Sequence, residues 1–101
     1  MTLEYFKTQI KDELEGAKDY IDKAIEAKVS HPEWSCTFCS MSEMEISHAE
    51  HLLNMLKMFI RDMNKTVTNT PSTLAPEETF KECMKEYTET KNYVCNMKRG
   101  L

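Results

Sequence analysis

The sequence predicts an all-α protein, in which a long antiparallel helical hairpin is followed by a third helix. Three observations lead to this prediction. The 101 residues include only 2 Gly and 3 Pro, well below the roughly 7% and 5% of average proteins, which disfavours a turn-rich sheet protein. Apolar residues recur every three or four positions, which is the period of an amphipathic helix. The pattern breaks at only two places, so three helices are expected.

The first predicted helix extends from about Thr2 to Val29. Its apolar residues form one stripe, and Glu, Lys and Asp occupy the other side. Ser30 and Glu33 then have the spacing of a capping box, and Pro32 suits the first turn of a helix, so a second helix should begin almost at once. The apolar stripe comprises Leu3, Phe6, Ile10, Leu14, Ala17, Ile21, Ala24 and Ile25.

The second predicted helix ends near Asn64, and we expect one stripe of it to face the interior. This stripe is long and mixes apolar residues with one carboxylate and one imidazole. Such a pattern predicts a helix that is buried along one side. The stripe comprises Trp34, Phe38, Met41, Glu45, His48, Leu52, Met55, Phe59 and Met63.

A Thr-rich connection with two prolines follows, in which neither the helical nor the strand period is visible. We expect residues 1–65 to form the hairpin, 66–75 the connection, and 76–101 a C-terminal helix of the same domain. This last helix should run to about Lys98, because basic residues suit the negative end of a helix. Its stripe comprises Phe80, Met84, Tyr87, Val94 and Met97.

The lengths of the helices predict association. At about 1.5 Å per residue, the first two helices are each on the order of 40 Å long, and their short connection forces them side by side. Such a hairpin cannot bury both stripes alone. The third helix covers part of the exposed surface, and a second hairpin related by a two-fold axis would cover it more fully. We therefore expect a homodimer, or a higher homo-oligomer, that contains a four-helix bundle.

Charge and composition exclude several classes of protein. The 17 acidic and 13 basic residues lack the positive excess of a nucleic-acid binder. No apolar run approaches the roughly 20 residues that cross a bilayer, and the N-terminal sequence does not have the pattern of a secretory leader. We expect a cytoplasmic protein with neither nucleic acid nor membrane as partner. The four cysteines are too few for a disulfide scaffold, so reduced thiols are expected.

Three residues carry the predicted chemistry. Glu45 and His48 differ by about 60° around the second helix and therefore share a side. Glu13 lies between Ile10 and Ala17 in the stripe of the first helix. In an antiparallel hairpin, residues equidistant from the turn lie at the same height. The midpoint of Glu13 and Glu45 is position 29, and that of Glu13 and His48 is 30.5, so all three should meet at one level.

Carboxylates in an apolar stripe need a cation or a partner, because burying an isolated charge is costly. One Glu together with Glu-x-x-His from the neighbouring helix is half the ligand set of a di-iron carboxylate site. Two-fold symmetry would supply the other half. We therefore expect a homodimer that holds two iron or manganese ions between two copies of Glu13, Glu45 and His48, with coordination positions left for oxidant.

Residues 3–63 resemble the ferritin-like superfamily, and specifically the short half-ferritins such as encapsulated ferritins. The resemblance rests on Asp12-Glu13-Leu14, on Glu45-Ile46-Ser47-His48-Ala49 and on the spacing between them. It implies a di-iron centre built across a dimer interface, in which Glu13 and Glu45 bridge or cap the metals and His48 is a terminal ligand. Oxidation of ferrous iron, a ferroxidase-type activity, is one function that the resemblance brings with it, and the family also includes oxidases and peroxide reductases. The third helix, the Thr-rich connection and the segment from Cys36 to Cys39 match no ferritin pattern.

Alternatives stand beside this hypothesis. Glu13, Glu45 and His48 could form a hydrogen-bonded group that specifies register in a non-catalytic helical adaptor or structural protein without metal. Glu50 and His51 are expected at the surface or beside the site. Core packing is the expected role of Tyr20, of Tyr87 and of the methionines of the second helix, which are Met41, Met44, Met55, Met58 and Met63.

The cysteines also leave alternatives open. Cys36 and Cys39 have the spacing of a zinc site or a redox pair. A second pair is missing, because Cys83 and Cys95 lie about three turns apart on one predicted helix. Ordinary thiols are therefore expected, and the alternatives are a site shared with His31 or a bridge from the second helix to Cys83.

Overall fold

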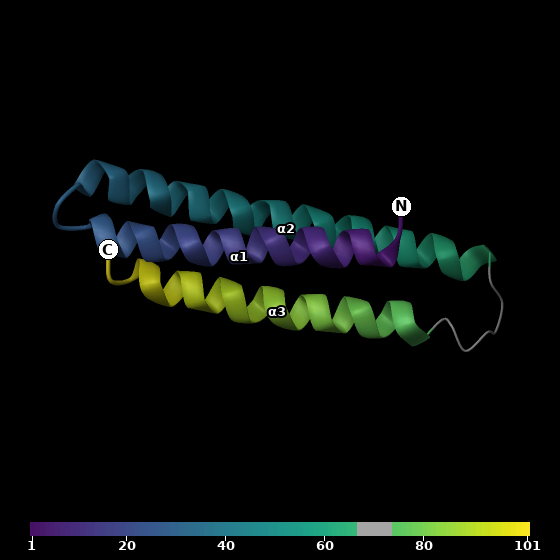
Figure 1. Ribbon diagram of the computed structural model, residues 1–101. Coiled ribbons are helices and arrows are strands. Elements are labelled where there is room, and N and C mark those ends of the chain that lie inside the picture. The colour runs from purple at the N-terminus through teal and green to yellow at the C-terminus, as the bar shows by residue number, and fades with distance from the viewer. Residues whose placement is uncertain (67–73) are drawn as a thin grey trace.

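The computed structural model describes residues 1–66 and 74–101, and all regular structure within them is helical. The helices are α1 (Leu3–Ala27), α2 (Pro32–Thr66) and α3 (Leu74–Lys98). α1 and α2 form an antiparallel hairpin, and α3 lies along it in the same direction as α1 (Figure 1). The predicted all-α class is confirmed. The predicted connection lies largely outside the described residues.

The ends of the helices follow local capping chemistry. Thr2 caps α1, because its hydroxyl accepts a hydrogen bond from the Tyr5 amide at 3.1 Å. α2 begins at Pro32, and the carbonyl of the preceding His31 accepts the Ser35 amide at 3.0 Å. The capping box expected at Ser30 was wrong: Ser30 lies one residue too early, and its hydroxyl contacts His31 Nδ1 at 3.0 Å instead.

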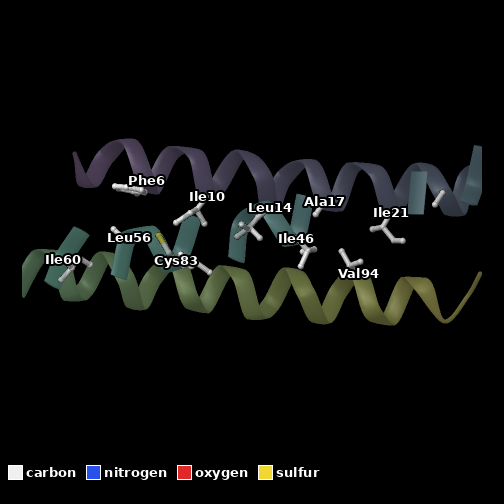
Figure 2. Close-up of a cluster of buried hydrophobic side chains, with 13 residues drawn as sticks. Phe6, Ile10, Leu14, Ala17, Ile21, Ile46, Leu56, Ile60, Cys83 and Val94 are labelled. Atoms are coloured by element: carbon white, nitrogen blue, oxygen red, sulfur yellow. The ribbon is translucent and has the colours of Figure 1, made fainter. Parts of the chain in front are cut away.

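The hydrophobic core lies between all three helices (Figure 2). The buried residues of α1 are those of its predicted stripe, together with Ala27 in place of Leu3 and Ile25. The buried row of α2 differs from the prediction by one position, or about 100°. Trp34, for example, is 57% exposed. The row that is buried comprises Ser35, Ser42, Ile46, Ala49, Leu53, Leu56 and Ile60.

Two buried serines fix the register of the hairpin. The Ser35 hydroxyl donates to the carbonyl of Ala24, and the Ser42 hydroxyl donates to that of Ala17, each at 2.7 Å. Both pairs are seven residues apart on their helices, so the same antiparallel offset is repeated two turns along. Buried hydroxyls must find such partners, because an unsatisfied polar group is costly. The offset therefore cannot slip without breaking both bonds.

Polar side chains attach α3 to the hairpin. The Tyr87 hydroxyl donates to Glu50 of α2, and the Tyr93 hydroxyl donates to Asp22 of α1. Lys98 forms an ion pair with Glu43 of α2 at 2.6 Å. These contacts establish which sides of α1 and α2 face α3.

The helices are long enough to cross a bilayer but too polar. At about 1.5 Å per residue, even 25 residues exceed the roughly 30 Å of a hydrocarbon core. Charged residues nevertheless recur along all three. No helix in the described part of the chain combines the length and the apolar character of a membrane span.

Candidate metal centre

The hairpin has a second, largely apolar face on the side away from α3, which we call the open face. Glu43 contacts α3, and Glu45 projects about 200° from it around α2. On α1, Lys18 lies over the ring of Tyr93, whereas Glu13 projects about 140° away. The open face comprises Tyr5, Gln9, Glu13, Gly16 and Tyr20 of α1, and Trp34, Phe38, Met41, Glu45, His48, Leu52, Met55, Phe59 and Met63 of α2, all half-buried or exposed.

The three predicted ligands meet in the middle of the open face. His48 Nδ1 lies 3.3 Å from Glu13 Oε2 and 4.0 Å from Glu45 Oε1. One ligand atom from each residue can be chosen so that all lie within 4.8 Å of one another. Among the described residues, no other group of three His, Cys, Asp or Glu side chains lies close enough to share an ion. The antiparallel spacing thus predicted the level at which they meet.

Their burial differs from the prediction of an interior site. The side chains of Glu13 and Glu45 are 23% and 25% exposed, and that of His48 is 50% exposed. The difference arises because the buried row of α2 is rotated by one residue, which places Glu45 and His48 at the rim of the hairpin. α3, the remaining helix of the described residues, lies on the other side of the hairpin.

The electrostatics of the cluster favour a bound cation. A hydrogen bond with Glu13, together with burial and the charge of Glu13, raises the pKa of Glu45 to about 7, while nearby His48 acts in the opposite direction. Two carboxyl groups at this distance need a proton or a cation between them. Among the described residues, neither forms an ion pair with a lysine or an arginine.

The donor set suits a transition metal. Bonds of about 2.0–2.2 Å to a transition metal place two ligand atoms no more than about 4.4 Å apart. The ligand atoms of this cluster lie within 4.8 Å of one another, so the side chains would have to close in slightly to hold one ion. Carboxylate and imidazole donors together suit iron and manganese. One chain supplies three ligands, so an ion held here would keep vacant positions on the solvent side.

Other candidate residues take structural roles. Glu50 belongs to the opposite side of α2, where it accepts from Tyr87 and pairs with Lys91 at 3.5 Å. These contacts lower the pKa of Glu50. Tyr20 stacks on Phe38 across the hairpin, with ring centroids 6.3 Å apart. The residues beside the cluster therefore pack and attach helices rather than extend the ligand set.

Two residues at the site were not singled out by the sequence analysis. Gly16 lies directly against the Glu45 side chain, and Ser42 ties α2 to α1 one turn before Glu45. A glycine in the interior of a helix is the signal that could have identified the first, because it weakens a helix unless packing requires it. A serine in a helix carries no comparable signal.

The cysteines are free thiols, as expected. Cys36 is exposed, Cys39 is half-buried and Cys83 is buried, and no bridge joins them. Burial and the neighbouring Glu43 carboxylate raise the pKa of Cys39. A raised pKa disfavours the thiolate that redox chemistry and metal binding require.

Comparison of the chain with protein-family models, with curated proteins and with solved structures finds no match. The chemistry of this protein must therefore be inferred from the arrangement of its own residues. The most distinctive arrangement is the Glu13, Glu45 and His48 cluster on the open face.

Proposed function

We propose that the protein binds iron or manganese through Glu13, Glu45 and His48, and that two copies of the chain surround a pair of ions in a homodimer. One observation carries the proposal. Three ligand atoms of the right chemistry lie within 4.8 Å, and two of them belong to carboxyl groups that no lysine or arginine neutralises in the described part of the chain. A divalent cation can replace the proton that the two carboxyl groups would otherwise share.

The second copy follows from the incomplete ligand set. One chain offers one Glu and one Glu-x-x-His, which is half of the ligand set that holds a pair of ions in di-iron four-helix bundles. The open face also exposes large apolar side chains, with Trp34 57% and Met55 42% exposed. A second hairpin packed on this face would bury them and bring three further ligands to the same level, as in di-iron four-helix bundles.

The order of residues on the open face of α2 fits a two-fold axis. Counted outward from a centre near His48, most positions of the open-face stripe of α2 carry similar types of residue in both directions along the helix. An antiparallel second copy with its axis there would place aromatic and methionine residues against one another, Glu45 against Leu52, and His48 near the axis. Such self-complementarity is what an isologous interface requires. The positions matched in this way are Trp34 with Met63, Phe38 with Phe59, and Met41 with Met55.

Oxidation of ferrous iron is the reaction that this site would support. Ferrous iron is then the substrate, and dioxygen the oxidant. Two ferrous ions give up one electron each, and dioxygen takes up these electrons and two protons to form hydrogen peroxide. The residues of the chain hold the ions side by side, and the carboxylates offset their charge before and after oxidation. The same donors would hold manganese without this reaction.

The test is metal content and oligomer mass measured on the same sample. Protein stripped with chelator and reloaded anaerobically with ferrous iron, or with manganese, should contain about one ion per chain and have the mass of a dimer. Glu13→Ala and His48→Ala should each bind none. His51→Ala is the matched control, because His51 is an exposed histidine outside the cluster and its loss should leave the metal content unchanged.

The melting temperature provides a second measurement. An ion that binds only the folded state stabilises it by mass action, so loading should raise the melting temperature of the wild type but not of His48→Ala. A chain that is dimeric, takes up no iron or manganese and melts at the same temperature with and without them would contradict the proposal. That result would favour a non-catalytic helical adaptor.

A further inference from the structure

Gly16 lies against the carboxylate of Glu45 where α1 passes α2. A Cβ atom at position 16 would stand 2.9 Å from Glu45 Oε2, 3.4 Å from Cδ and 3.6 Å from Cγ. The first distance is shorter than a carbon and an oxygen tolerate without a bond. Any side chain at this position would therefore displace the carboxylate.

The backbone of α1 does not itself require glycine here. Gly16 is in the middle of a regular right-handed helix, a conformation that alanine adopts more readily than glycine. The three nearest atoms that a Cβ would meet all belong to the flexible Glu45 side chain. If position 16 only had to support the helix, alanine would be the better residue. The absence of a side chain therefore leaves room for the Glu45 carboxylate.

The helices cannot separate to make room. Ser42 lies one turn before Glu45 and is fully buried, and its hydroxyl holds the carbonyl of Ala17 at 2.7 Å. Ala17 is the neighbour of Gly16 and is also fully buried. The spacing of the two backbones is therefore set at this level. With a side chain at position 16, Glu45 would have to change rotamer, and its distance from the other two ligands would change.

We propose that Gly16 is a positioning residue of the metal site: it leaves open the space in which the Glu45 carboxylate stands beside Glu13 and His48. The effect on metal affinity rests on the function proposed above. The effect on the position of Glu45 does not, because it follows from packing alone.

The experiment compares Gly16→Ala and Gly16→Val with the wild type. Mn²⁺ affinity is measured by calorimetry, and Co²⁺ is used as a second probe because its visible spectrum reports ligand geometry. We expect Gly16→Ala to bind Mn²⁺ at least about tenfold more weakly, the usual effect of disturbing a group that orients a ligand, with an altered Co²⁺ spectrum. Gly16→Val should bind more weakly still.

Stability separates positioning from packing. Metal-free Gly16→Ala should melt at the wild-type temperature or above it, because alanine is the better helix former. Thr8→Ala is the matched control. It also improves helix propensity at an exposed site of α1, and should leave Mn²⁺ affinity and the Co²⁺ spectrum unchanged.

Each result has a distinct meaning. Wild-type affinity and spectrum in Gly16→Ala, or a lowered melting temperature of the metal-free variant, would overturn the role of Gly16 and leave the proposed function intact. If the wild type binds no metal, the proposed function fails. The crystal structure of metal-free Gly16→Ala then still decides the point, because an unmoved Glu45 carboxylate would overturn the inference and a displaced one would support it.

Discussion

The two faces of the α1–α2 hairpin differ in how completely they are covered. On the covered face, the side chains of Ile10 and Leu56 are inaccessible to solvent. On the open face, Met55 is 42% exposed, although it is the chain neighbour of Leu56. The candidate ligands all belong to the open face. Apolar periodicity alone therefore does not distinguish a core from a surface that carries a site.

The composition of the two faces reflects this difference. The covered face of α2 consists of branched aliphatic residues and of small ones such as Ser42 and Ala49, which let the helices approach closely. The open face is rich in methionine and aromatic residues. Methionine is unbranched and polarisable and adapts to surfaces of irregular shape. This is the composition expected of a surface that packs against another protein surface rather than against its own chain.

The largest effect is predicted for the pair Leu56→Ala and Met55→Ala. Leu56→Ala empties space in the fully enclosed core and should lower the free energy of unfolding by about 2–5 kcal/mol. Met55→Ala removes a side chain that solvent already reaches, and should cost less than about 1 kcal/mol in dilute, monomeric protein. Urea unfolding followed by circular dichroism measures both.

The effects of Met55→Ala and Leu56→Ala should also depend differently on protein concentration. Met55→Ala should weaken self-association, which sedimentation at several concentrations detects, whereas the cost of Leu56→Ala should be present at every concentration. Equal losses of stability from both variants in dilute solution would show that the two faces do not differ as described.

The sequence allowed the helices to be predicted well, because their stripes are long and regular. It predicted the wrong buried row for α2, since a pattern based on large apolar residues follows Trp34, Phe38 and Met41. The buried row instead contains Ser35 and Ser42. Their small size and their hydrogen bonds to α1 decide which side faces inward. The influence of these serines depends on how closely α1 and α2 approach each other. The pattern of apolar residues along one helix carries no information about that distance.

The level of the candidate site was predictable for a geometric reason. Antiparallel helices joined by a short turn pair residues that are equidistant from it, and Glu13 has this relation to both Glu45 and His48. The exposure of the cluster was not predictable, because it depends on where α3 lies. The contact of Gly16 with Glu45 was not predictable either, because it depends on how each helix is oriented about its own axis.

A smaller effect is predicted at Ser42 of the covered face, where α2 contacts α1. Ser42→Ala removes the buried hydrogen bond to Ala17 and should lower the free energy of unfolding by about 1 kcal/mol. Ser40 is exposed, so Ser40→Ala should leave stability unchanged or slightly raise it through helix propensity. Urea unfolding of the two variants gives the difference. If Ser42→Ala proved as stable as Ser40→Ala, the serine bonds would not hold the register.

The smallest effect concerns the pH dependence of the metal-free protein. The pKa of Glu45 is raised in the folded state to about 7, above its value of roughly 4.3 in an unfolded chain. The stability that comes from its shared proton is therefore fully present below about pH 4.3 and is lost as the pH rises through about 7. The effect should be small, because Glu45 is 25% exposed and the two carboxylates can move apart into solvent.

Glu45→Gln isolates this contribution, because an amide donates a hydrogen bond to Glu13 at every pH and does not ionise. Glu43 and Glu50, whose pKa values are lowered, act in the opposite direction but equally in both proteins. The wild-type free energy of unfolding minus that of Glu45→Gln should therefore fall between pH 5 and pH 8 in metal-free protein. Saturating Mn²⁺ should abolish the fall in the wild type, because the ion replaces the shared proton. A flat difference in the metal-free state would show that the two carboxyl groups of the open face do not interact.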